Sequence, residues 1–276
     1  MNLVADNGLP GLHRVGIWFN DPANWWGPTG LITYASEHLG YTLAVVCAAT
    51  LIAVPLGLVI GHTGRGTIWV AGLTNASRAV PTLGLLILLI VAVSPHIHIE
   101  RGLGRVVPAG SVPYIVPVLL VLILIAVPPL LTSTYAGVRS LDPLIREAAA
   151  GSGMTPLQVV LKVELPCAAP LVIAGLRSAT LQVMATLTVA AYAPLVGGLG
   201  RLIVDGHQNL ADLRYGYPAM VAAGISVAVL AFAVDLLLQA AQRLIVSPGL
   251  TLAAGARRHA VGAKAHSAAR GTGAAE

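Results

Sequence analysis

Few side chains in this chain could do chemistry, and the most informative of them lie in a short polar stretch between apolar runs. The stretch begins Glu147-Ala148-Ala149-Ala150-Gly151-Ser152-Gly153 and, nine residues later, ends Val163-Glu164-Leu165-Pro166. Glycine adopts positive φ without strain, so Gly151 and Gly153 predict a reversal of the chain. Glu147 is a single charge among small residues, which suits the rim of a protein contact. The stretch therefore predicts a docking segment rather than a catalytic centre.

Other patterns that could do chemistry are weak or absent. The chain has two lysines, Lys162 and Lys264, and neither follows the Gly-x-x-x-x-Gly of a phosphate-binding loop. No Gly-x-Ser-x-Gly or His-Glu-x-x-His occurs, so a hydrolase has no support. His96-x-His98 could hold a metal, but such a pair without nearby carboxylates or cysteines is more often a polar loop feature. We expect no enzyme activity, no metal and no cofactor on this chain.

The composition places these residues in a membrane. The chain is 56% hydrophobic and 10% charged, and its mean hydropathy is +0.81, whereas a soluble domain carries about 25% charged residues. Basic residues exceed acidic ones, with a net charge of +5. They gather near the ends of apolar runs and in the C-terminal tail, without interleaved aromatic residues, which indicates membrane topology rather than nucleic-acid binding.

Apolar runs long enough to cross a bilayer set the fold class. A span needs ~20 predominantly apolar residues and must be helical, because lipid cannot satisfy the backbone. The sequence predicts an all-α membrane protein with about five transmembrane helices, at residues 39–61, 68–93, 113–135, 168–195 and 217–242.

Several polar residues and three charged ones fall within these runs. Arg78 interrupts the second run, Arg177 lies in the first third of the fourth, and Asp235 lies toward the end of the fifth. Ionisable residues at membrane depth usually pair or serve transport. Asp235 could pair with Arg78 or with Arg177, and Arg78 could instead orient its helix at the interface. Thr82 and other hydroxyl side chains could line a passage, although helix packing explains them equally well.

The runs divide the chain into three parts. We expect an extracytoplasmic segment at 1–38, a transmembrane domain at 39–248 with a polar loop at 139–166, and a disordered basic cytoplasmic tail at 249–276. Nine basic residues on one side of the spans against five on the other favour an N-terminus outside and a C-terminus inside. Aromatic residues from Trp18-Phe19 to Trp25-Trp26 predict an interfacial anchor before the first span.

Local signals predict a helix, a turn and a second helix in the polar loop. A short helix spans 141–150, and Thr155 then caps a new helix that has Pro156 at its first position. Its apolar residues form one face, and Pro166 is expected to close it. Apolar patches on an exposed loop usually mark a partner surface.

The loop resembles the coupling loop of ATP-binding-cassette (ABC) importer permeases of the inner membrane. Their signature is Glu-Ala-Ala, a Gly six residues after the Glu, and a closing hydrophobic-x-Leu-Pro. The matching residues here are Glu147, Ala148, Ala149, Gly153, Leu165 and Pro166, with Val163 in place of the usual Ile. The resemblance implies two separate ATPase subunits that bind ATP and Mg²⁺, a second permease subunit, and an extracytoplasmic solute-binding protein.

Further segments resemble one branch of that family, the osmoprotectant permeases for glycine betaine, carnitine, choline and proline betaine. They are Arg78 to Leu86, Gly175 to Thr180, Gly197-Gly198-Leu199-Gly200 and Asp235-Leu236-Leu237. The connection from Arg201 to Gly216 is longer than is usual for the family. An ABC permease for an amino acid or another small solute is an alternative, and an ion-coupled secondary transporter is a more distant one.

Overall fold

The computed structural model describes residues 10–79, 81–99, 110–210, 212 and 215–245, and within them every regular element is a helix. Within these ranges, four helices are long and apolar enough to cross a membrane. They are α2 (Leu31–Thr63), α5 (Val112–Arg139), the continuous helix Pro156–Ala190, and α10 (Gly216–Ile245). They contain the predicted first, third and fifth spans and cover the fourth, 168–195, as far as Ala190, which confirms the all-α membrane class. The predicted tail at 249–276 lies outside the described residues.

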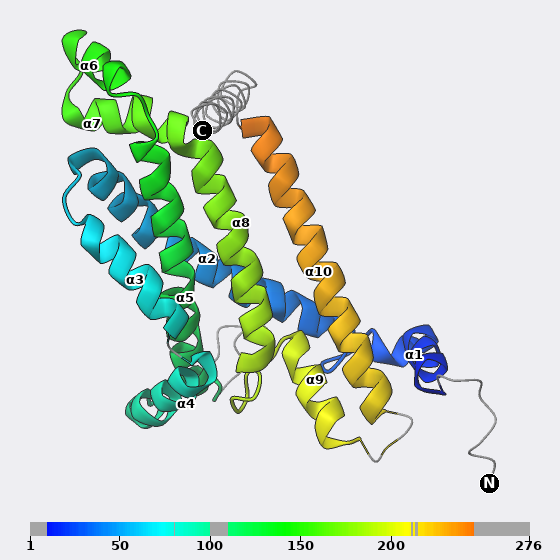
Figure 1. The fold of residues 1–276 in the computed structure, drawn as a ribbon. Coiled ribbons are helices and arrows are strands. Elements are labelled where there is room, and N and C mark those ends of the chain that lie inside the picture. The colour runs from blue at the N-terminus through cyan, green and yellow to red at the C-terminus, as the bar shows by residue number, and fades with distance from the viewer. Residues whose placement is uncertain (1–9, 80, 100–109, 211, 213–214, 246–276) are drawn as a thin grey trace, which may run out of the picture.

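The predicted second span, 68–93, is wrong as a single helix. The segment forms two short helices, α3 (Thr67–Ala79) and α4 (Thr82–Val93), and Figure 1 shows α4 turning away from the line of α3. Between them Pro81 has an extended backbone, with φ −64° and ψ 110°. Proline lacks an N–H for the helix ladder. Neither half reaches the ~20 residues that a span requires.

Close backbone approach packs α2, α5 and α8 (Leu165–Ala190) into one unit. A Cβ added at Gly61 of α2 would lie 2.6 Å from the Val138 Cβ of α5. A Cβ added at Gly175 of α8 would lie 2.5 Å from Ser133 Cβ, also on α5. Small residues permit this packing where lipid provides no hydrophobic driving force between helices.

The helix before α8 does not end at Pro166, contrary to the sequence prediction. It runs from α7 (Pro156–Val159) through the π-helical turn η3 (Val160–Glu164) into α8. The Leu165 N–H bonds the carbonyl of Val160, five residues back. A wider turn gives the ring of Pro166 room beside the preceding turn, where a regular α-turn would clash.

The two ends of the bundle carry different short helices (Figure 1). α6 (Pro143–Gly151) and α7 lie at one end, here called the coupling end, and α1 (Pro10–Asn20) and α9 (Leu199–Gln208) lie at the opposite end. Much of the connection between Arg201 and Gly216 is therefore helical. The apolar face of α9, with Leu199 and Leu202, packs against α10.

The N-terminal aromatic residues do not share one environment. Trp18 is buried in the cluster that also contains Leu199 and Leu202, and its ring meets that of Phe19 edge-on. Trp26 is 69% exposed. The prediction of an interfacial anchor is therefore wrong for Trp18 and stays a prediction for Trp26.

Candidate functional site

The coupling segment, residues 139–166, begins with a well-capped helix. The Asp142 carboxylate accepts a hydrogen bond from the Leu144 N–H at 3.1 Å, and Pro143 occupies the first turn of α6. An acceptor at the N-cap satisfies a free N–H, and a proline there has no N–H to satisfy. The start of the helix is therefore set by its own sequence.

The predicted turn after α6 is also present. Gly153 has φ +86°, and no atom lies within 4 Å of the position that its Cβ would take. Thr155 then caps α7 through a reciprocal pair of hydrogen bonds with Gln158. The helix–turn–helix prediction is confirmed by these contacts.

The outward surface of this segment is apolar with one acidic residue. Glu147 and Ala148 are exposed, whereas Ala149 packs inward. Five large apolar side chains are exposed on this surface: Leu144, Ile145, Met154, Leu157 and Leu161. Exposed apolar side chains in such number mark a surface that a partner covers. Of the remaining predicted residues, Gly153 and Pro166 are exposed and Leu165 is half-buried.

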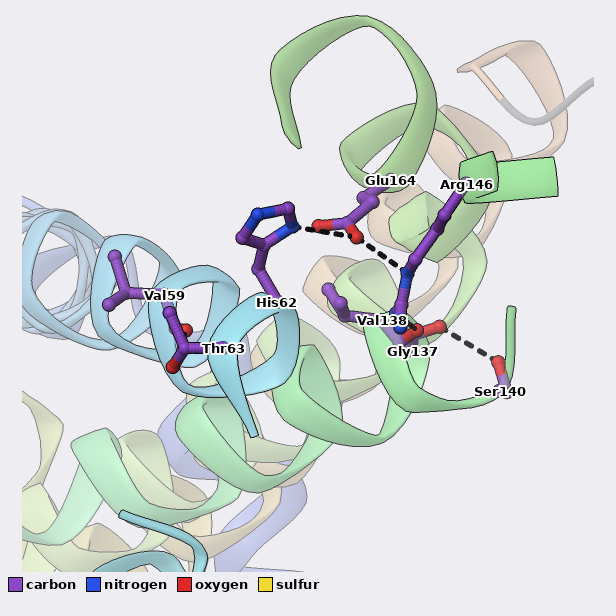
Figure 2. A network of polar contacts seen from close by, with 8 residues as sticks. All are labelled: Val59, His62, Thr63, Gly137, Val138, Ser140, Arg146 and Glu164. Carbon is purple, nitrogen blue, oxygen red and sulfur yellow. Dashed lines mark hydrogen bonds and ion pairs between the residues drawn. The ribbon is translucent and has the colours of Figure 1, made fainter. Parts of the chain in front are cut away.

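A buried ion-pair network, which the sequence did not reveal, lies behind this surface (Figure 2). Glu164 of η3 is fully buried, and its Oε1 lies 2.6 Å from Nε of Arg146 and 3.0 Å from Nδ1 of His62. The Arg146 guanidinium also donates to the carbonyl of Val138. The signal in the sequence was Glu164 itself, the only acidic residue between Glu147 and Asp205.

Within the described residues, the network leaves two buried polar atoms, Nε of Arg146 and Oε2 of Glu164, without a hydrogen bond. The contact between Arg146 Nε and Oε1 is close, but it lacks hydrogen-bond alignment. A buried carboxylate is costly unless it is paired. The charges of Arg146 and of a protonated His62 are the groups that could compensate it.

The opposite end of the bundle contains another buried carboxylate, that of Glu37 in α2. Its Oε2 accepts the N–H of Gly198 at 2.8 Å, at the N-terminus of α9. The neighbouring residue, Gly197, has no room for a side chain, because a Cβ would lie 2.0 Å from Oε2 of Glu37. The contact holds α9 against α2. It gives a structural role to part of the glycine-rich segment at 197–200.

The predicted pair between Asp235 and Arg177 is present. Arg177 donates from Nε to Oδ1 at 2.9 Å and from Nη2 to Oδ2 at 3.0 Å, and Gln239 donates to Oδ2 at 3.1 Å. The two side chains are 27% and 17% exposed, and they join α8 to α10. The side chain of Arg78, the other predicted partner, lies outside the described residues. Thr82 is half-buried at the first position of α4.

Within the part of the chain that the structure describes, the histidine pair considered as a metal site does not belong to a larger ligand cluster. His96 Nδ1 contacts the carbonyl of Ala92 at 2.9 Å, and His98 is exposed. Among the residues that the structure describes, no three His, Cys, Asp or Glu side chains gather closely enough to hold a metal ion.

Similarity to known proteins agrees with this arrangement. The choline transport system permease protein OpuBB of Bacillus subtilis (strain 168) is 31% identical over 78% of this chain and 88% of its own length. The glycine betaine/carnitine/choline transport system permease protein OpuCB of the same organism is 29% identical over 80% and 90%.

A solved structure extends the similarity to the fold. An inward-facing conformation of the MetNI methionine ABC transporter superposes with a TM-score of 0.63 at 20% identity, over 79% of this chain and 96% of that one. Residues 53–246 match the family described as binding-protein-dependent transport system inner membrane component. The chain therefore belongs to the binding-protein-dependent inner membrane components of transport systems.

Proposed function

We propose that this chain is the permease subunit of an ATP-driven importer for quaternary ammonium osmoprotectants. The proposed solute rests on the similarity to permeases named for choline, glycine betaine and carnitine, at about 30% identity over most of both chains. Similarity along almost the whole length of the relatives supports a shared task rather than a shared segment.

The coupling segment supports the proposed mode of action. Its exposed apolar residues and Glu147 form a surface suited to an ATPase subunit, which would bind ATP and Mg²⁺. The chain itself has no phosphate-binding loop. A second permease subunit, either a copy of this chain or a relative, would complete the passage, and an extracytoplasmic binding protein would deliver the solute.

The orientation belongs to the same proposal. An ATPase that uses cellular ATP must meet the coupling segment on the cytoplasmic side. The end with α1 and α9 then faces outward, with the N-terminus outside and the C-terminus inside. The distribution of Lys and Arg favours the same orientation.

The alternatives have less support. Similarity to the methionine transporter is limited to the fold at 20% identity, so it does not indicate which solute this chain transports. An ion-coupled secondary transporter is expected to place carboxylates near the membrane midplane, beside broken helices. The broken segment here, residues 67–93, contains no acidic residue.

Uptake in cells tests the cargo. The chain is expressed together with the ATPase and the binding protein of its own importer, in bacteria that lack their own osmoprotectant importers. We expect ATP-dependent uptake of labelled choline or glycine betaine, and no uptake of labelled methionine. Uptake of methionine without that of any quaternary ammonium compound would overturn the proposed cargo.

A further inference from the structure

Arg146 and Glu147 are neighbours in α6, yet they face in different directions. Glu147 is exposed on the partner surface, whereas the Arg146 side chain is 22% exposed and reaches back into the bundle. Consecutive residues of an α-helix point about 100° apart, so one short helix can carry both an outward and an inward contact. Arg146 is therefore placed to convey any displacement of α6 to the helices behind it.

The partners of Arg146 come from three other elements. Glu164 belongs to η3, which leads into α8, and Val138 lies near the end of α5. His62 lies in the last turn of α2 and contacts the same oxygen of Glu164 (Figure 2). The network thus joins α6 to the ends of α2 and α5 and to the start of α8. These are the helices that pack most closely in the bundle.

The π-helical turn sets the position of Glu164. A π turn inserts one extra residue into the helical repeat and rotates the residues that follow it relative to those before it. Glu164 lies at the end of this turn and is fully buried, while Lys162 in the same turn is exposed. Such turns occur frequently at functional sites. The local irregularity here has a specific consequence, which is a carboxylate aimed at Arg146.

The chemistry of the network is better suited to fixing the position of α6 than to stabilising the fold. A buried ion pair contributes little net stability relative to apolar residues of the same size, but removal of one partner is strongly destabilising. Oε2 of Glu164 is left without a partner, which adds a cost that an apolar side chain would avoid. Because the Glu164 carboxylate is present despite this cost, we infer that it serves to hold α6 in position.

We propose that Glu164 and Arg146 are positioning residues that make α6 and the ends of α2, α5 and α8 move as one body, with His62 as an auxiliary partner. The inference rests on the proposed function only in requiring that an ATPase acts on α6. Neither residue touches the solute or the nucleotide. They determine how much of the ATPase movement reaches the membrane helices.

The coupling ratio of the reconstituted complex tests this role. Permease, ATPase and binding protein are placed in liposomes, and solute molecules accumulated are divided by ATP molecules hydrolysed. We expect Glu164→Gln, which keeps the shape and removes the charge, to lower this ratio about tenfold, within the usual range of coupling between sites. The matched control is Arg243→Gln, which removes an exposed charge near the end of α10, outside the coupling segment, and should leave the ratio unchanged.

A conservative variant separates positioning from folding. Arg146→Lys retains the charge and should keep a ratio nearer to wild type than Arg146→Gln, with equal amounts of assembled complex. Equal ratios for Lys and Gln at position 146, with Glu164→Gln also at the wild-type ratio, would overturn the proposal.

A distance measurement tests the same claim without reference to the cargo. Spin labels are attached at Thr63 and Ala150, exposed positions on α2 and α6, in a chain whose Cys47 and Cys167 are replaced. In wild type the distance should have one narrow distribution with and without ATP, and Glu164→Gln should broaden it. A wild-type distance that changes when ATP binds, or a narrow distribution in Glu164→Gln, contradicts the rigid link. Absence of uptake of any quaternary ammonium compound, together with the expected distances, would refute the cargo alone.

Discussion

Two buried carboxylates, one near each end of the bundle, are held in different ways. Glu164 at the coupling end is held by the charged guanidinium of Arg146 and by the imidazole of His62. Glu37 at the opposite end is held by the backbone N–H of Gly198 and is confined by Gly197. The first contact depends on charge, and the second depends on the shape of a glycine-rich turn. The same residue type therefore responds differently to substitution at the two ends.

The largest effect is expected at the charged network. Arg146→Met removes the main compensating charge and leaves Glu164 buried, which should destabilise the protein by about 3 kcal/mol. Thermal unfolding in detergent micelles measures the change, and Arg139→Met, at an exposed arginine nearby, is the control. The double variant Arg146→Met, Glu164→Leu should recover much of the loss. A double variant no more stable than Arg146→Met would show that charge does not govern this network.

A smaller effect is expected from shape at the opposite end. In Gly197→Ala the new Cβ would lie 2.0 Å from Oε2 of Glu37, so the Glu37 side chain or the turn at 197–200 must shift. We expect a loss of about 1–3 kcal/mol, typical of overpacking. Thermal unfolding measures it, and Glu37→Ala in the same chain should relieve the clash. If Gly197→Ala unfolds at the wild-type temperature, Glu37 is not confined by this turn.

Gly153 provides a matched case in which space is free. Its φ of +86° is unfavourable for a residue with a side chain, but a Cβ would meet no atom within 4 Å. Gly153→Val should cost about 1–2 kcal/mol from backbone strain alone. Because the strain lies in the coupling segment, ATPase activity stimulated by the binding protein should fall while the chain remains in the membrane. Normal stimulation with normal uptake would refute the role of the turn.

The smallest effect should come from neutralising Glu37. In Glu37→Gln the side-chain carbonyl can still accept the N–H of Gly198, so the stability should change by about 1 kcal/mol or less. Glu164→Gln should lower the unfolding temperature more than Glu37→Gln does, when both are measured in the same micelles. The reverse order would undo the distinction between the two carboxylates.

Local chemistry allowed much of the coupling segment to be predicted. Asp142, Thr155 and Pro156 act within their own turns, and Gly153 needs only its own backbone freedom. The partners of Glu164 are different in kind. His62 is 102 positions away in the chain, so only the packing of α2 beside η3 brings the two together. No local pattern carries that information.

Within the apolar runs, a proline did not by itself predict whether the helix would be interrupted. Pro55 in α2 and Pro128 and Pro129 in α5 all lie inside continuous helices. Pro81 follows the same kind of apolar run, yet the chain breaks into α3 and α4 there. Neighbouring helices can satisfy the backbone groups that a proline frees. Whether a proline breaks a span therefore depends on its neighbours in space, which the sequence alone did not provide.

The most direct test of the account is the side of the membrane on which the coupling segment lies. Single cysteines are introduced as Ala23→Cys and Ser152→Cys, at exposed positions near opposite ends of the bundle, in a chain without Cys47 and Cys167. In intact cells an impermeant maleimide should label position 23, and it should label position 152 only after permeabilisation. Labelling of position 152 in intact cells would mean that no cytoplasmic ATPase can reach the coupling segment, which would contradict the proposed import function.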